Sequence, residues 1–219
     1  MARFRSAALL ALSALAFAAL LQGCGKKEAA ERRGLIKSTL APGADVGHPR
    51  PISFQDLASM PEPPGIQVKD PRYESNRIPA FPNPLGLKEG DIVSVRAWLQ
   101  MVTFASDEDF NLRFTATPGS RDHYLTSEIP DEDDVTDPAL LKMVDAARTN
   151  VKNTFLGGHD PSRQGTMLAE PVYVEITGQL FFSDARIGTP APDKQGLTRA
   201  SYWQVHPVLS VTVLPKPGQ

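Results

Sequence analysis

The change of hydrophobic period from residue 91 onward is the feature that most constrains the fold of this chain. Apolar and polar residues alternate in three successive segments, residues 91–104, 110–116 and 123–129, and again in residues 172–182 and 202–214. A period of two is typical of half-buried β-strands. Between the third and fourth segments the period becomes helical. The predicted order is therefore strand, strand, strand, helix, strand, strand.

The helical segment has its own start and stop signals. Asp137 is a good N-cap, and Pro138 stands at the first helical position, where its missing N–H costs nothing. Apolar residues then recur at spacings of four, three and four, which places them on one stripe. They are Leu140, Val144, Ala147 and Val151. Gly157 and Gly158 indicate the end of the helix.

Two residues predict irregularities in the last two strands. Gly178 lies inside the fourth strand, where a glycine indicates a sharp bend or a bulge. Pro207 lies inside the fifth strand, where its missing N–H predicts a sheet edge or a bulge.

Three strands, a helix and two further strands is the order of the OB-fold, a five-stranded, partly open Greek-key barrel. We therefore predict a mainly β domain with one helix, a five-stranded OB-like Greek-key barrel (β-β-β-α-β-β), over residues 90–219. An α+β sandwich of five strands would have the same order and stays open as an alternative. The stretch from Trp203 to Val208 resembles the later strands of poorly characterised exported bacterial OB-like proteins. That resemblance covers the domain only and implies no activity.

Residues 24–89 have a different composition, which predicts a tether followed by a proline-rich extension. Ten of the 20 prolines lie between Pro42 and Pro84, so regular helix or interior strand is disfavoured there. A short helical turn is predicted at Ser53, with Asp56 in the capping-box position. The basic residues 25–33 predict a solvated tether. Apolar side chains predict that the later half lies on the domain: Phe54, Ile66, Tyr73, Ile78 and Phe81.

The first 23 residues have the pattern of an export signal. Arg3 and Arg5 precede an uncharged, apolar run over residues 7–21, which is shorter than a membrane-spanning helix. The residues that follow, up to Gly23 and Cys24, resemble the lipobox of bacterial lipoproteins. The resemblance implies cleavage between Gly23 and Cys24, and lipid modification of Cys24 by diacylglyceryl and palmitate-like acyl chains.

This resemblance implies a lipid-anchored protein of the cell envelope, exported from the cytoplasm. In sorted lipoproteins an Asp just after the cysteine favours the inner membrane, whereas Gly25 follows Cys24 here. The outer membrane is therefore favoured, if the bacterium has one. Cys24 is the only cysteine, so the exported part has no internal disulfide.

The charge of the barrel segment argues against nucleic acid as a partner. Residues 90–214 contain 10 Lys and Arg against 17 Asp and Glu. Oligonucleotide binding needs basic surface to neutralise phosphates. The partners that remain are the membrane, through the anchor, and an envelope protein or an oligosaccharide.

The acidic loops suggest an alternative, a degenerate metal-dependent hydrolase. Asp107 and Asp109, followed by Glu128, loosely resemble the acidic clusters of thermonuclease-type OB enzymes, which imply carboxylate ligands for a hard cation. Phe110 replaces the hydroxyl residue of that family's first loop, and its arginine-containing stretch is not reproduced. The four histidines lack ligand spacing such as H-x-x-x-H. We therefore predict no metal, no cofactor and no catalytic residue.

A candidate binding surface is predicted from polar faces of the first and last strands. Trp98 and Arg96 share one face of the first strand, and Tyr202 and His206 share one face of the last. Trp203 lies on the opposite face and is predicted to belong to the core. Taken together, the residues predict an envelope lipoprotein with a non-catalytic OB-like binding or assembly domain. The alternatives are the hydrolase and a scaffold that contacts only envelope proteins.

Overall fold

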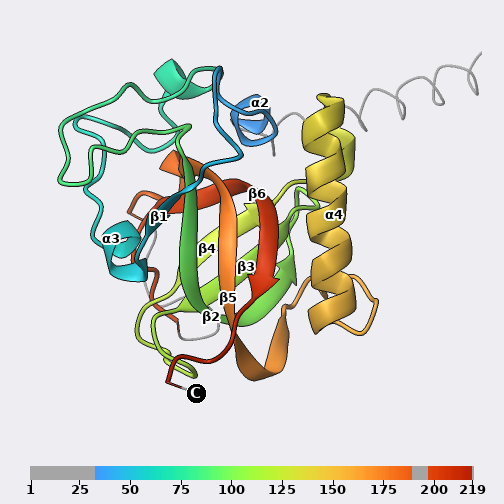
Figure 1. The fold of residues 1–219 in the computed structure, drawn as a ribbon. Coiled ribbons are helices and arrows are strands. Elements are labelled where there is room, and N and C mark those ends of the chain that lie inside the picture. Colours follow the sequence, from blue (N-terminus) through green and yellow to red (C-terminus); the bar gives the residue numbers. More distant parts are fainter. Residues whose placement is uncertain (1–32, 189–196, 219) are drawn as a thin grey trace, which may run out of the picture. The chain divides into compact units, whose positions relative to one another are not determined.

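Five strands close into a barrel in the computed structural model, which describes residues 33–188 and 197–218 (Figure 1). They are β2 (Ile92–Phe104), β3 (Phe110–Thr115), β4 (Leu125–Ile129), β5 (Thr166–Phe182) and β6 (Trp203–Val213). Their order is β2-β3-β4-β6-β5, and β5 pairs back with β2. The β4–β6 pair is parallel and the other pairs are antiparallel. The predicted five-stranded barrel is confirmed.

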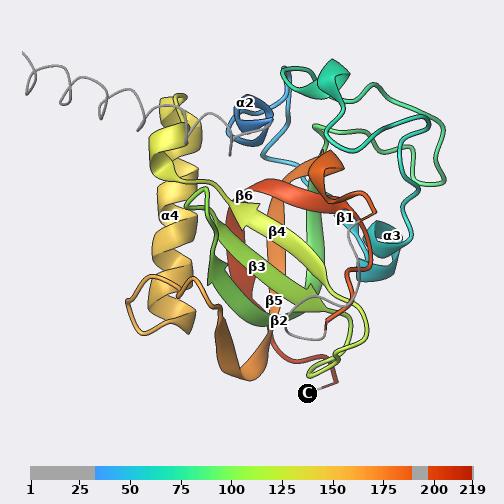
Figure 2. The ribbon, with the colours of Figure 1, turned by 180° about the vertical axis from the view of Figure 1, so that it is seen from behind.

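The one long helix among the described residues, α4 (Pro138–Phe155), lies between β4 and β5 in the chain, as predicted. The Asp137 side chain accepts hydrogen bonds from the backbone N–H groups of Ala139 and Leu140, and Pro138 is the first helical residue. The predicted stripe faces inward, because its four residues are all buried in the core. The helix packs beside β6, along the wall of the barrel (Figures 1 and 2).

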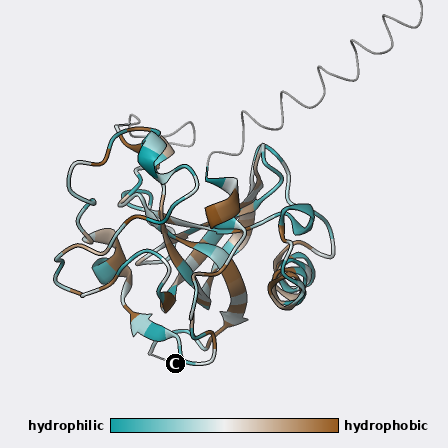
Figure 3. Cartoon of the chain, turned by 90° about the horizontal axis from the view of Figure 1, so that it is seen from above, coloured by the Kyte–Doolittle hydropathy of each residue, from teal (hydrophilic) through white to brown (hydrophobic). Residues whose placement is uncertain are grey.

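The interior of the barrel is built from alternate residues of each strand, as the period of two predicts. Leu112 and Phe114 of β3, for example, are fully buried. Trp203 is also fully buried, which confirms its predicted place in the core. Hydrophobic residues gather on the strands, and the surrounding loops are mainly hydrophilic (Figure 3).

The predicted irregularity in the last two strands is a bulge between β5 and β6. The register shifts on both sides of Gly178, which pairs with Val208. A Cβ atom at Gly178 would lie 2.2 Å from the backbone oxygen of Pro207. Only glycine therefore allows the two strands to approach this closely.

The extension before the barrel is folded against it from Arg33 onward. It contains α2 (Gly34–Lys37), β1 (Arg50–Ile52) and α3 (Phe54–Ala58). Strand β1 pairs in parallel with β2, and the capping box predicted at the start of α3 is present. The apolar residues predicted to lie on the domain do so: Phe54 and Ile78 are buried in the core, and Ile66, Tyr73 and Phe81 pack against it. Three 3₁₀ turns complete the described elements, at Pro71–Tyr73, Glu132–Asp134 and Asp184–Arg186.

The prediction of a solvated tether is wrong for its last residue. Arg33 is 1 % exposed, and its guanidinium forms an ion pair of 2.7 Å with Glu89. The same guanidinium donates to the carbonyl oxygens of Tyr73, Phe182 and Asn76. A buried arginine with these acceptors is compatible with the low-dielectric interior because its charge is paired. Residues 25–32 of the predicted tether lie outside the described residues.

Candidate functional site

The three acidic residues of the hydrolase alternative are brought together with a histidine. Asp107 and Asp109 belong to the tight loop between β2 and β3, Glu128 lies on β4, and His206 lies on β6. The loop is closed by a hydrogen bond from the Ala105 N–H to the Asp109 carbonyl. Because β4 and β6 are neighbours in the barrel wall, Glu128 and His206 come into contact across 78 residues of sequence.

Glu128 is the centre of this cluster. Its Oε1 accepts a hydrogen bond of 2.7 Å from Asn111 Nδ2. Its Oε2 accepts one of 3.0 Å from Gln204 Nε2 and lies 2.9 Å from His206 Nδ1. The carboxylate is thus surrounded by side chains from β3 and β6, and it fixes the imidazole ring of His206.

The second ring nitrogen of His206 points toward Asp109. His206 Nε2 lies 3.5 Å from Asp109 Oδ2 and makes no hydrogen bond. The other oxygen of Asp109 accepts the backbone N–H of Asp131. Asp109, Glu128 and His206 each offer a ligand atom, and these atoms lie within 4.8 Å of one another.

The positive charge at the cluster comes from the extension. Lys37, at the end of α2, places Nζ 3.1 Å from Asp107, 3.7 Å from Glu128 and 3.9 Å from Asp109. Lys37 and Asp107 are the more exposed members, at 20 % of each side chain, whereas the His206 side chain is fully buried.

The pKa shifts follow from burial and from these charges. Burial opposes the charge of Lys37, but Glu128, Asp109 and Asp107 together hold its pKa above the ordinary value. Burial raises the pKa of Asp109 well above its ordinary value, although Lys37 opposes the shift. For Glu128, burial is outweighed by Lys37 and His206, and the pKa is held well below the usual value. Burial lowers the pKa of His206, which therefore favours neutral imidazole.

The arrangement can hold a small cation but does not present its acids to a large substrate. The Asp109 and Glu128 side chains are only 5 % and 10 % exposed. A hydrolase would need these carboxylates beside the scissile bond. In this conformation Lys37 lies beside both carboxylates and little of either reaches solvent, so the geometry does not favour hydrolysis.

A second candidate site lies on the outer face of β2 and β5. Trp98 of β2 and Tyr173 of β5 are cross-strand partners, and their ring centroids lie 5.2 Å apart. Two residues before Trp98, Arg96 Nε donates to Glu175 Oε2 at 2.7 Å. These four side chains line a hollow of about 720 Å³ together with residues 51–56. We call this the aromatic hollow.

The four residues predicted as one binding surface are therefore divided between different places. Trp98 and Arg96 lie together in the aromatic hollow. Tyr202 is half-buried, and its hydroxyl accepts the N–H of Gly188. His206 is fully buried beside Phe181, Asp109 and Glu128, so it cannot belong to an exposed surface. Sequence reasoning missed Tyr173 and Glu175, although their alternation with buried residues of the same strand was a usable signal.

The face that OB barrels commonly use for ligands, on their second and third strands, corresponds here to β3 and β4. On that outward face Asn111 and Thr126 are buried and bonded to neighbouring side chains. Residues 197–200 run along the start of β4, where Tyr124 exchanges backbone hydrogen bonds with Thr198 and Ala200. From this segment the Arg199 side chain donates to Thr126 Oγ1, so neighbouring side chains bury several outward residues of this face.

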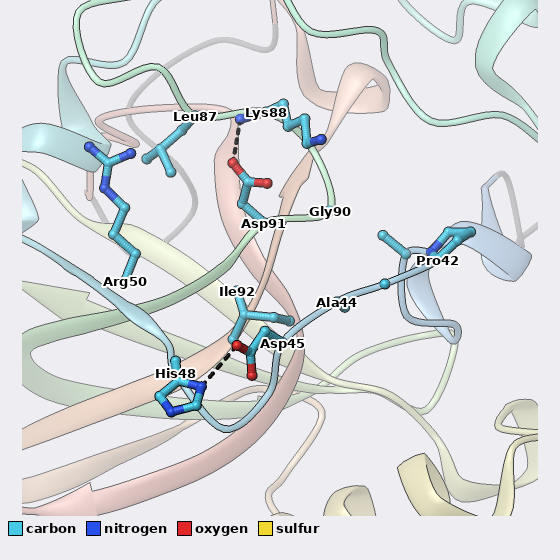
Figure 4. Close-up of a pocket in the computed structure, with 12 residues that line it drawn as sticks. Pro42, Ala44, Asp45, His48, Arg50, Leu87, Lys88, Gly90, Asp91 and Ile92 are labelled. Atoms are coloured by element: carbon cyan, nitrogen blue, oxygen red, sulfur yellow. Dashed lines mark hydrogen bonds and ion pairs between the residues drawn. The ribbon is translucent and has the colours of Figure 1, made fainter.

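A third hollow, of about 290 Å³, lies between residues 41–50 and the start of β2 (Figure 4). Two of its carboxylates are already paired within the hollow. Asp45 bonds the exposed His48, and Asp91 accepts the N–H of Lys88, as the dashed lines show.

Comparison with family models and with curated protein sequences gives no match. Within the described residues, none of the helices has the length and apolar character needed to cross a membrane. Gly23 and Cys24, the predicted processing site, lie outside the described residues.

Proposed function

We propose that this protein is a lipid-anchored envelope protein whose barrel is a non-catalytic module that binds an oligosaccharide in the aromatic hollow. The observation that carries the proposal is the pairing of Trp98 with Tyr173 beside the ion pair of Arg96 and Glu175. Aromatic faces stack on the apolar faces of sugar rings, and the charged pair supplies donors and acceptors for hydroxyl groups.

The exposure of these groups supports a surface role. Trp98 and Tyr173 are half-buried, and the Arg96 side chain is 64 % exposed. The part of the Trp98 ring that is in contact with water would gain free energy if a ligand covered it. On the common OB ligand face, in contrast, neighbouring side chains bury several outward residues. The aromatic hollow is therefore the better-suited surface for a ligand.

The anchor determines which oligosaccharides the module would meet. A chain acylated at Cys24 would hold the barrel close to an envelope membrane, where the abundant polysaccharide is that of the cell wall. The acidic barrel segment also disfavours polyanionic ligands. A neutral or zwitterionic glycan is the ligand class that fits.

Co-sedimentation of the full chain in detergent with purified cell-wall glycan tests this function. Trp98→Ala should weaken binding about tenfold, since a stacked aromatic ring contributes about 1–2 kcal/mol to binding. Met167→Ala is the matched control, because Met167 is an exposed apolar residue of β5 that does not line the aromatic hollow. Binding that is equal in the wild-type and Trp98→Ala chains would contradict the proposal.

A further inference from the structure

The buried cluster at the end of α2 is not used by the oligosaccharide function. We propose that Asp109 and His206 form a binding site for a divalent transition metal of the Zn²⁺ class, and that Lys37 competes with the metal for the same carboxylates. Asp107 is the further carboxylate that becomes available when Lys37 withdraws.

The first support is the orientation of His206. A metal-binding histidine usually donates its other ring N–H to a carboxylate, which fixes the tautomer and leaves the second nitrogen free to bind the metal. His206 Nδ1 lies 2.9 Å from Glu128 Oε2, which leaves Nε2 as the nitrogen with a lone pair. Nε2 is fully buried and has no hydrogen-bond partner. An unpaired buried nitrogen of this kind costs free energy unless it gains a ligand.

The second support is the spacing of the two ligand atoms. Zinc bonds nitrogen and carboxylate oxygen at about 2.0–2.2 Å, so two ligands of a tetrahedral ion lie about 3.4 Å apart. His206 Nε2 and Asp109 Oδ2 are separated by 3.5 Å. The pair therefore matches one edge of a zinc tetrahedron without movement of either side chain.

The third support is the balance of charge. Three carboxylates, from Asp107, Asp109 and Glu128, face one ammonium group and an imidazole. One ammonium leaves an excess of negative charge in a buried place, which a divalent ion would compensate.

Lys37 lies on the route by which a metal ion would enter the cluster, and it also competes with the ion for the Asp109 carboxylate. Lys37 and Asp107 are the partly exposed members of the cluster, so an ion from solvent reaches His206 past them. Lys37 Nζ lies 3.9 Å from the oxygen of Asp109 that would bind the metal. A divalent ion bound to that oxygen would lie close to the ammonium group, and the two positive charges would repel each other strongly. The metal therefore binds only as Lys37 moves away.

Zn²⁺ titration against a chromogenic chelator tests the site. It uses the full chain, untagged and in detergent, with Cys24→Ser to remove the only thiol. We expect a stoichiometry of one and a dissociation constant of about 1 µM or tighter for this parent chain. Lys37→Met should tighten binding at least about tenfold, because the competing charge is removed. Co²⁺ should give the intense visible absorption of four-coordinate cobalt.

Two variants separate this site from adventitious binding. Asp109→Asn keeps the shape of the side chain and should weaken Zn²⁺ binding at least about a hundredfold, because an amide oxygen is a poor zinc ligand. The loss is expected both in the parent chain and in the chain that also carries Lys37→Met. His48→Ala, which removes an exposed histidine paired with Asp45, should change nothing. Circular dichroism checks that each variant is folded.

Three results would each overturn the proposal. They are absence of binding in both the parent chain and Lys37→Met, equal affinity of these two chains, and full binding by folded Asp109→Asn. The readout is metal binding alone, so it is independent of whether the aromatic hollow binds a glycan.

Discussion

Arg33 joins the first described residues of the extension to the barrel through a buried ion pair. Its guanidinium pairs with Glu89 and lies 4.6 Å from the centre of the Phe181 ring. Glu89 in turn accepts the backbone N–H groups of Ile78 and Phe182, so one buried ion pair joins three separate segments. Both side chains are almost fully buried, which makes this pair unlike the exposed ion pairs elsewhere on the surface.

Arg33→Met should lower the free energy of unfolding by about 3–5 kcal/mol, because it leaves the Glu89 carboxylate buried without its countercharge. Urea unfolding followed by tryptophan fluorescence measures this change. Adding Glu89→Gln to the same chain should restore part of the loss, since the uncompensated charge disappears while an oxygen remains for the backbone donors. A loss below about 1 kcal/mol for Arg33→Met would show that the pair does not hold the extension.

The candidate cluster can be predicted from sequence only in part. Asp109 and Glu128 can be recognised as acids near the ends of neighbouring strands, because a strand end is marked by residues within a few positions of it. The prediction that places His206 on a surface is wrong, since periodicity gives the face of a strand but not what covers that face. Lys37 is not predictable at all, because its contact with Asp107 joins residues 70 positions apart in the sequence.

At the scale of elements, the strands and the helix are predictable because their signals are local. The two-residue period and the cap at Asp137 act within a few residues and do not depend on the rest of the chain. Strand β1 escapes prediction, since it has only three residues, includes Pro51, and exists through its pairing with β2. The ion pair between Lys37 of α2 and Glu128 of β4 escapes prediction for the same reason, because it joins distant segments.

Val144→Asp tests the packing of α4 on the barrel. Val144 is fully buried, so an aspartate there would be a buried charge without a partner, and the protein should lose more than about 3 kcal/mol of stability. Ala146→Asp is the matched control, because Ala146 is exposed on the same helix and the change should cost about 0.5 kcal/mol. Thermal melting of both variants gives the comparison. Equal melting temperatures would mean that the apolar stripe does not support the fold.

At the scale of the whole molecule, the predicted anchor at Cys24 precedes the residues that form the described fold, which begins at Arg33. The core residues lie between Ile52 and Val211. If Cys24 carries the predicted lipid, its loss should change where the protein resides without changing how the barrel folds. This separation also means that the aromatic hollow and the buried cluster can be studied in chains that lack the lipid.

Cys24→Ser tests the anchor directly. If Cys24 accepts the lipid, its replacement should abolish incorporation of labelled palmitate and leave a slower-migrating precursor, because the serine hydroxyl does not accept the diacylglyceryl group and cleavage before residue 24 then fails. Gly25→Ala is the control, since it changes the next residue and keeps the thiol. Several acyl chains give a lasting attachment at about 0.8 kcal/mol for each buried CH₂, so the wild-type and Gly25→Ala chains should remain in the membrane fraction through a high-salt wash. Palmitate labelling of Cys24→Ser at the wild-type level would show that the chain carries no lipid at this cysteine.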